Sequence, residues 1–431
     1  MTTTKAISKI GIYAGGGTSH SWLWFVDLFE NKGLHTLAFL NESDVQKGLD
    51  DLDVLVISGG DTFAVAEALG PSGADSIGRF VQRGGLYIGS CAGAYLPMKS
   101  SKKPLDLFNF VDVKITNLSK ILPATVKESF KFCTSYGCDF IFHPVREEIS
   151  LRSSNSVLPF CPLTFTAPLY GGPGMTVTDP SLVLATYHGF TTHTSFLVSE
   201  ALAGEILLEK AAVVRVPMGK GLFYLFGPHL EHPKYPLANQ FVSDVINWET
   251  RPLECPESPA PFSHREITPL KELSGKKKKT FVMDIKRELS NSRIVAVNLE
   301  FLPIRWMIGK KVYEPEKVRV FLESMWSRIK SLERMDRLRV FSGDLETIRA
   351  VSVKVTQGLR RLKRAVDDNQ DSLPGATEIF SWLQQLSMAF YTMYFLTLTH
   401  EDNRPPPSVK IRQSLTSANH HNRRVNCKLD Q

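Results

Sequence analysis

The 431-residue sequence has few cysteines, no long apolar run and no apolar leader at its start. Six scattered cysteines are too few for a disulfide framework in a chain of 431 residues. The opening segment Met1–Lys9 contains no apolar stretch of the kind found in secretory signals. The most apolar segment, Leu386–Leu398, is shorter than the roughly 18 residues that a membrane span needs. These absences predict a soluble, reduced, cytoplasmic protein with no transmembrane segment.

Motifs for metals, cofactors and nucleic acids are also missing. Cys133 and Cys138 have no second pair of cysteines or histidines at zinc-ligand spacing. The glycines Gly15–Gly17 match neither the phosphate-loop motif nor the dinucleotide-binding motif G-x-G-x-x-G. Basic and aromatic residues are not interleaved in a way that would indicate sequence-specific nucleic-acid recognition. We therefore expect no metal, no cofactor and no sequence-specific nucleic-acid partner.

Charge is distributed unevenly along the chain. Residues 1–259 contain 20 Lys+Arg and 25 Asp+Glu, whereas residues 260–431 contain 31 and 19. Five prolines between Trp248 and Pro269, followed by the run Lys276–Lys279, predict an extended and then basic linker. The basic C-terminal third predicts either a solvated surface or a docking surface for an acidic protein or another anionic surface.

These patterns predict two folded parts. Residues 1–250 form an α/β domain, 251–280 a linker, 281–402 a helical domain, and 403–431 a disordered tail. Apolar residues at helical spacing predict three helices in the second part, and no reactive constellation is visible there. An aromatic stripe on the last helix is expected in the core rather than at a ligand site: Phe380, Phe390, Tyr391, Tyr394 and Phe395.

Short apolar segments alternate with amphipathic ones in the first hundred residues. Ile10–Tyr13, Asp53–Ile57 and Leu86–Gly89 lack polar alternation, as strands of a parallel sheet covered on both faces do. We therefore predict a mostly parallel, doubly wound sheet, with its ligand site beyond the carboxyl ends of the strands. Three loops are expected at that edge: Gly15–Thr18, Gly59–Asp61 and the turn at Cys91.

The turn at Cys91 contains the strongest functional signal. Gly89-Ser90-Cys91-Ala92-Gly93 is a G-x-C-x-G version of the nucleophile elbow, in which a strand enters and a helix leaves. The two glycines permit a strained turn and close packing of helix on strand. Backbone N–H groups at such a turn can bind an oxyanion, and the turn can favour a thiolate. The alternative is that Cys91 is a small apolar core residue.

A thiol nucleophile needs a base and a group that orients the base. His229 follows the predicted strand Leu222–Phe226, and Glu231 lies two residues later, so both side chains face the same way in extended backbone. We predict Cys91 as nucleophile, His229 as base and Glu231 as its orienting partner. His232 has no carboxylate at the same spacing. The alternative is a surface turn with incidental charges.

Together these residues resemble the class I glutamine amidotransferase-like superfamily, whose members combine a G-x-C-x-G elbow with a late His-x-Glu. Within it, the chain is most similar to the N-terminal domain family of biotin–protein ligases, over roughly residues 7–248. Three segments support this likeness: Phe80–Tyr95, Ser58–Asp61 and Tyr170–Pro173.

The resemblance implies an oxyanion site formed by the N–H groups of Gly59 or Gly60, next to that of Ala92. The remaining candidate substrate-binding residues are Gly16, Tyr170 and Gly171. The usual His-Pro-Glu appears as His229-Leu230-Glu231, with the proline displaced to Pro228. Nothing resembles the ATP and biotin loop of a ligase, so biotin transfer is not expected.

The sequence therefore predicts a cysteine-dependent amidase, hydrolase or acyl-transfer enzyme for a small-molecule amide or acyl substrate. The alternative is a non-catalytic binding or scaffold protein of the amidotransferase-like type. In that case the basic helical domain would recruit an acidic partner.

Overall fold

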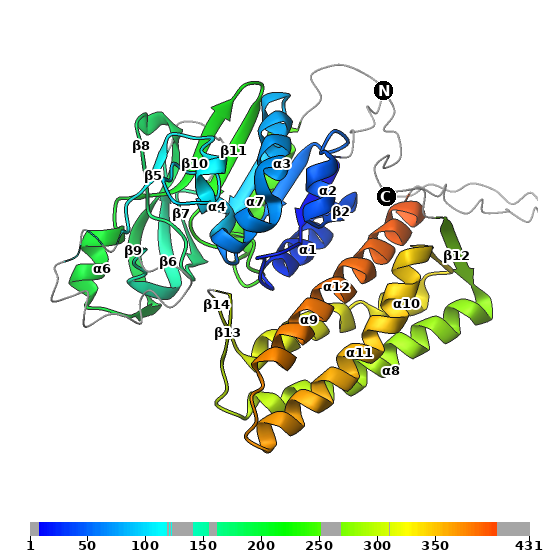
Figure 1. Cartoon of the computed structure of the whole chain (residues 1–431). Helices are drawn as coiled ribbons and strands as arrows, with labels where there is room; N and C mark the ends of the chain where they lie inside the picture. The colour runs from blue at the N-terminus through cyan, green and yellow to red at the C-terminus, as the bar shows by residue number, and fades with distance from the viewer. Residues whose placement is uncertain are drawn as a thin grey trace, which may run out of the picture.

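The structure is a computed structural model that describes residues 8–118, 120, 122, 141–154, 162–250, 269–309 and 311–402 (Figure 1). An α/β part contains the central sheet, and helices from the C-terminal third lie beside it. In chain order the α/β part comprises β1 (Ile10–Tyr13), α1 (Trp22–Asn31), β2 (Leu37–Leu40), α2 (Glu42–Lys47), β3 (Val54–Ile57), α3 (Thr62–Gln82), β4 (Leu86–Ser90), α4 (Ala92–Tyr95), β5 (Val113–Ile115), β6 (Val145–Ser153), β7 (Thr164–Pro168), β8 (Met175–Val177), β9 (Val183–Phe196), α6 (Glu200–Leu207), β10 (Ala211–Met218), β11 (Gly221–Phe226) and α7 (Pro236–Glu249).

The central sheet has the strand order β2-β1-β3-β4-β11-β10-β9-β6-β7. The five strands from β2 to β11 pair in parallel, and those from β11 to β7 pair antiparallel. β1, β3 and β4 are buried along their whole length, as expected for strands covered on both faces. The predicted α/β fold class with a C-terminal helical part is thus confirmed, and its parallel half carries the predicted site.

Helices cover both faces of the parallel half. Along β3, Val54 and Val56 belong to the core shared with α1 and α7, whereas Leu55 and Ile57 belong to the core shared with α3. This alternation follows from the period of two in a strand. The sheet is therefore doubly wound at the point where the predicted functional loops leave it.

The C-terminal third forms β12 (Leu270–Ser274), α8 (Gly275–Glu300), β13 (Trp306–Ile308), β14 (Lys311–Tyr313), α9 (Pro315–Trp326), α10 (Ile329–Arg334), β15 (Arg337–Phe341), α11 (Ser342–Asp367) and α12 (Leu373–Asp402). The basic run Lys276–Lys279 was predicted in a linker, but it forms the first turns of α8 because β12 pairs with β15 just before it. Residues 251–268 of the predicted linker and the tail 403–431 lie outside the described residues. Within the described ranges, no helix is long and apolar enough to cross a membrane.

The helical part packs against the edge of the sheet, and the two share one apolar core. Figure 1 shows α12 running past β2. There the ring of Phe39 lies 5.7 Å from that of Tyr391 and 6.0 Å from that of Phe395, measured between centroids. The aromatic stripe predicted on the last helix is buried in this core. Residues more than 300 positions apart therefore stabilise one another.

A buried cation also connects the two parts. Arg328, which is 5% exposed, places Nη2 2.6 Å from Asp27 Oδ1 and 2.5 Å from Glu30 Oε2 of α1. The hydroxyl of Tyr394 donates to Glu30 Oε1 at 2.6 Å. Burial raises the pKa of Asp27 by more than the charge and hydrogen bond of Arg328 lower it, so this carboxylate needs its cationic partner to stay ionised.

Replacing Arg328 with methionine should destabilise the whole chain, because two carboxylates on α1 would lose their partner. The expected loss is about 3–5 kcal/mol in the free energy of unfolding, measured by urea denaturation. Arg334→Met, on an exposed arginine of α10, is the matched control and should change little. Equal stabilities of the two variants would contradict the role assigned to Arg328.

Candidate active site

Cys91 follows β4 directly and has backbone angles φ 51° and ψ −106°. This is an unfavourable region for a residue with a Cβ atom, so neighbouring bonds must hold it. Cys91 N–H donates to Phe226 O at 2.9 Å, and Gly93 N–H donates to Ser58 O at 3.2 Å. The thiol is free and 8% exposed. The strained turn predicted from the G-x-C-x-G pattern is present.

Both glycines of the pattern are required by close packing. A Cβ atom on Gly93 would lie 1.9 Å from Ile57 O, and one on Gly89 would lie 2.3 Å from Gly93 O. Because these contacts are with backbone atoms, they cannot be relieved by a change of rotamer. Any side chain would push α4 away from β3 and β4 and move Cys91.

The predicted base and its partner meet behind Cys91. His229 Nδ1 donates to Glu231 Oε1 at 2.6 Å, and the two residues are 3% and 0% exposed. Burial by itself lowers the pKa of His229, but the charges of Glu231 and Cys91, with hydrogen bonds to both, raise it to about 10. The structure therefore brings Cys91, His229 and Glu231 together, although they span 140 positions of the chain.

Ser90 is a residue of this site that sequence reasoning missed. Its hydroxyl donates to both carboxylate oxygens of Glu231, at 3.0 and 2.9 Å, and Ser90 is fully buried. A hydroxyl preceding Cys91 was visible in the sequence, but a small side chain in a tight turn needs no partner. The role of Ser90 as a donor to Glu231 becomes visible only in the structure, where Glu231 lies next to the end of β4.

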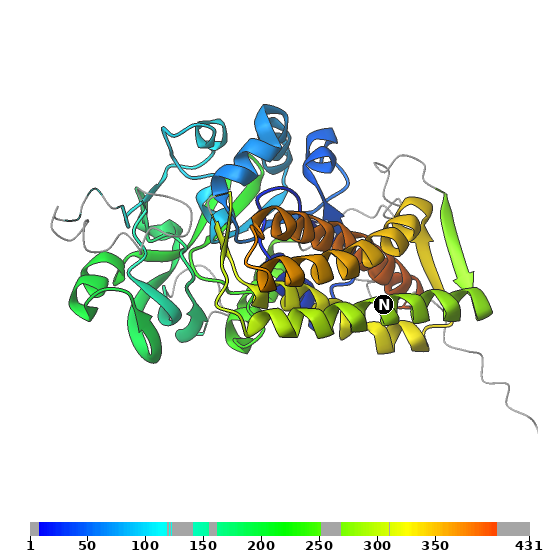
Figure 2. The same cartoon turned by 60° about the horizontal axis from the view of Figure 1, so that its bottom comes forward.

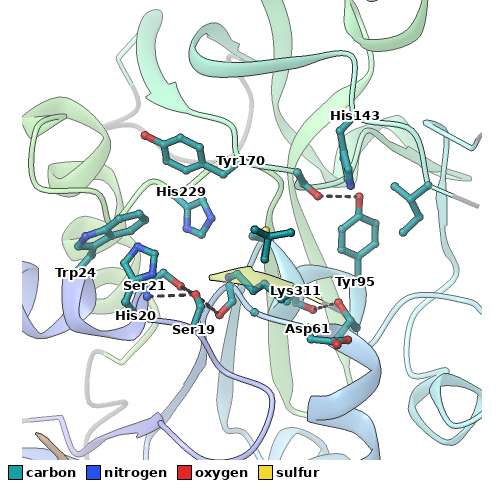
Figure 3. Close-up of a pocket in the computed structure, with 18 of the residues that line it drawn as sticks. Ser19, His20, Ser21, Trp24, Asp61, Tyr95, His143, Tyr170, His229 and Lys311 are labelled. Atoms are coloured by element: carbon teal, nitrogen blue, oxygen red, sulfur yellow. Dashed lines mark hydrogen bonds between the residues drawn. The ribbon is translucent and has the colours of Figure 1, made fainter. Parts of the chain in front are cut away.

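A cavity of about 500 Å³ opens over Cys91 at the carboxyl ends of β1, β3 and β4 (Figure 3). Seven of the predicted site residues line it: Gly59, Gly60, Cys91, Ala92, Tyr170, Gly171 and His229. Glu231 lies behind His229. In the described part of the chain, no group of three or more His, Cys, Asp or Glu side chains is placed to hold a metal ion.

Gly16, predicted as a substrate-binding residue, lies elsewhere. Its N–H donates to Glu42 Oε2 at 3.2 Å, and Gln384 of α12 donates to the neighbouring Gly15 O at 2.7 Å. The loop Gly15–Gly17 is thus filled by protein groups. None of its three glycines is among the described residues that line the cavity. The next residues, Ser19–Ser21, line it instead.

Gly59 leaves room for the imidazole. A Cβ atom there would lie 2.6 Å from His229 Cε1 and 3.2 Å from its Nε2. The neighbouring Gly60 meets the backbone of Gly17, whose oxygen a Cβ would approach to 2.2 Å. The absence of a side chain at Gly59 therefore permits His229 to reach the cavity. This role is separate from the hydrogen bond that the Gly59 N–H could donate.

Aromatic rings hold His229 in place. The Trp24 ring lies edge-on to His229 at 5.2 Å and to His232 at 4.5 Å, and the Tyr170 ring lies 5.8 Å from His229. Burial lowers the pKa of His232 to about 4, and the charge of His229 acts in the same direction. Among the described residues, His232 has no carboxylate partner comparable to Glu231, whose oxygen lies 2.6 Å from His229 Nδ1. Trp24 was predicted only as a helix residue.

The cavity is also lined by the C-terminal third, where sequence reasoning saw no reactive constellation. The hairpin β13–β14 and the start of α9 project toward the α/β part (Figures 1 and 2). They contribute a set of lining residues: Lys311, Val312, Glu314, Glu316, Lys317 and Val320. No local pattern marks these residues, because their role depends on how the helical part docks.

The fold and the turn at Cys91 define a class, an α/β protein whose sheet carries a turn of the nucleophile-elbow type. Within that class, residues 49–103 match the family described as biotin-protein ligase, N terminal. This segment contains the glycine loop at Gly59 and the turn at Cys91, so the resemblance predicted from the sequence is confirmed there. No curated protein matches the chain in sequence.

Several solved structures share part of the fold. A putative GMP synthase component from Thermoplasma acidophilum aligns at TM-score 0.36 and 14% identity, over 56% of this chain and 94% of that one. A putative ThuA-like protein from Bacteroides uniformis aligns at 0.34 and 14%, over 58% and 94%. A β-galactosidase from Bacillus circulans sp. alkalophilus aligns at 0.33 and 10%, over 58% and 32%. Scores this low describe only a partial similarity of the fold.

Gly59→Ala should displace His229, since the new methyl group would overlap the imidazole. We expect alkylation of Cys91 at pH 7 to slow, and the overall stability to fall by about 1–3 kcal/mol as in other overpacked sites. Peptide mass spectrometry and urea unfolding measure the two effects. Gly189→Ala, where a Cβ meets nothing within 4 Å, is the control. Unchanged alkylation in Gly59→Ala would show that His229 does not need this space.

Proposed function

We propose that the protein is a cysteine-dependent hydrolase or acyl-transfer enzyme that acts on an amide or a related acyl group. The supporting observation is the hydrogen-bonded His229–Glu231 pair beside Cys91, at the floor of a cavity. The strained turn costs conformational energy, and in return it directs one thiol into that cavity. Strain of this kind is found at sites where a side chain must act as a nucleophile.

In the proposed reaction, the sulfur of Cys91 attacks the carbonyl carbon and forms a C–S bond. The carbonyl oxygen becomes an oxyanion that accepts hydrogen bonds from backbone N–H groups near Gly60 and Ala92. His229 then gives its proton to the leaving amine as the C–N bond breaks. Water or another acceptor attacks the thioester, His229 takes a proton from it, and the thiolate of Cys91 is released.

The electrostatics favour a resting ion pair. Because the pKa of His229 is raised to about 10, its imidazolium persists through the neutral range. An imidazolium beside a cysteine is the general arrangement that activates cysteine nucleophiles. Glu231 and its donor Ser90 keep the ring charged and oriented. Ser90 is thus a positioning residue.

The alternative function, a scaffold whose basic helices bind an acidic partner, has weaker support. Of the four lysines Lys276–Lys279, Lys278 is 9% exposed and donates to Glu333 O at 2.9 Å. This lysine is used within the fold. The basic run therefore offers fewer charges to a partner than its sequence indicates.

Iodoacetamide labelling of Cys91 tests the ion pair. In the wild type we expect rapid labelling already at pH 6, because the imidazolium of His229 favours the thiolate. In His229→Ala the labelling rate should be low at pH 6. It should rise only as the pH approaches the ordinary pKa of a thiol, about 8.5. Peptide mass spectrometry over pH 5–10 gives both profiles. Superimposable profiles would favour the scaffold function.

Turnover provides an independent test. A panel of small amides, assayed by release of the amine or ammonia, should contain at least one substrate of the wild type. Cys91→Ala should reduce its turnover to background, and Cys91→Ser should retain only a small fraction. His232→Gln is the control, since His232 lines the cavity but lies outside the proposed triad. Equal turnover by wild type and Cys91→Ala would overturn the proposed mechanism.

A further inference from the structure

A lysine from the helical part lies in the cavity of the α/β part. Lys311 is the first residue of β14, and Figure 3 shows its side chain in the middle of the cavity, among residues that include His229 and Asp61. The hairpin turn before it approaches the loop after β3, where a Cβ on Gly309 would lie 3.3 Å from Asp61 Oδ2. Contact with that loop places Lys311 near the proposed nucleophile.

The ammonium of Lys311 has no hydrogen bond or ion pair with any residue that the structure describes. Burial lowers the pKa of Lys311 to about 8, although Cys91 and Asp61 attract its charge, and the nearby Lys317 acts in the same direction as burial. Lys311 Nζ also lies 5.9 Å from the centroid of the Tyr313 ring, but no described residue accepts a hydrogen bond from it, and an anionic ligand would supply such an acceptor. The cavity thus contains a cation that is ready to accept a negatively charged ligand.

His20 provides independent evidence for a ligand site in the same cavity. It is 7% exposed and lines the cavity, and its Nδ1 has no hydrogen-bond partner in the described part of the structure. Its ring lies edge-on to Trp24 at 5.1 Å. Burial lowers the pKa of His20 well below its usual value, so the ring is neutral and has one N–H to donate. Such an atom is free to contact a ligand or an ordered water in the cavity.

Several acidic groups of the cavity already have partners. Glu147 accepts from the hydroxyl of Tyr170 at 3.0 Å, and Glu314 pairs with Arg305 at 3.1 Å. Asp61 accepts from Phe63 N–H and caps α3. These carboxylates stabilise the walls, whereas the ammonium of Lys311 and the Nδ1 of His20 have no such partner among the described residues.

We propose that Lys311 and His20 form a subsite for a carboxylate of the substrate, so that the substrate is an amide with a carboxylate close to its scissile bond. This proposal rests on the proposed function, since it places the subsite beside a reactive Cys91. The helical part then belongs to the active site and selects the substrate. Lys311 binds the carboxylate by charge, and His20 donates a hydrogen bond to it.

Two alkylating agents that differ by one charge test the subsite. Iodoacetate carries a carboxylate and iodoacetamide a neutral amide, and both alkylate Cys91 by displacing iodide. Lys311→Met should lower the ratio of the iodoacetate rate to the iodoacetamide rate at pH 7 by about three- to tenfold, as expected for loss of one nearby charge. Lys311→Arg should keep most of the wild-type ratio. Quantitative peptide mass spectrometry of the full chain gives both rates.

The iodoacetamide rate separates this proposal from the proposed function. If His229→Ala leaves that rate unchanged at pH 6, the triad fails whatever Lys311 does. If His229→Ala slows it but Lys311→Met leaves the ratio unchanged, the triad stands and the subsite is wrong. If Lys311→Met slows both reagents by the same factor, Lys311 acts on the thiolate, and the substrate subsite is again overturned.

Two further variants complete the experiment. Lys330→Met, on an exposed lysine of α10, removes the same charge from the helical part outside the cavity and should leave the ratio at its wild-type value. His20→Phe keeps an aromatic ring against Trp24 but removes the donor, and should lower the ratio by a smaller factor than Lys311→Met. If Lys311→Met does not fold, His20→Phe decides, and an unchanged ratio there would overturn the subsite.

Discussion

The site depends on the contact between Gly93 and the backbone of Ile57. A Cβ on Gly93 would lie 1.9 Å from Ile57 O, so only glycine lets α4 pack this closely on β3. That packing holds Cys91 at φ 51° and directs its thiol to the cavity. The same turn leaves the preceding Ser90 beneath the sheet edge, where its hydroxyl reaches Glu231. One backbone contact therefore positions both Cys91, the proposed nucleophile, and Ser90, which supports the proposed base through Glu231.

Burial of charge is the second constraint. Glu231 is fully buried, and a carboxylate in such surroundings must be compensated by donors and by an opposite charge. His229 supplies the charge and Ser90 a donor, while Trp24 packs against the imidazole. The carboxylate thereby raises the pKa of His229 against the effect of burial. The ionic state of the site is thus determined by the interior of the protein more than by solvent.

Local patterns explain what could be predicted from the sequence. The turn at Cys91 and the His229–Glu231 spacing depend on neighbouring residues and on the strand period, and both were predictable. Gly16 was placed in the substrate site because its loop follows β1, but Gln384, far along the chain, occupies that loop. Lys311 could not be predicted, because β14 meets the cavity only through the docking of the helical part. Long-range packing therefore accounts for the site residue that was misplaced and for the cavity residues that were missed.

The same docking links stability to substrate choice. Arg328 and Gln384 bind α1 and the loop after β1, and Phe39 of β2 packs on α12. These contacts set the position of the helical part, and the position of β14 follows from it. Without them, the apolar edge at Phe39 would be exposed and Lys311 would leave the cavity. The α/β part contains the proposed triad, whereas the shape and charge of the cavity require both parts. The part of the chain that carries the proposed triad thus shares its cavity with a region that contributes none of the three residues.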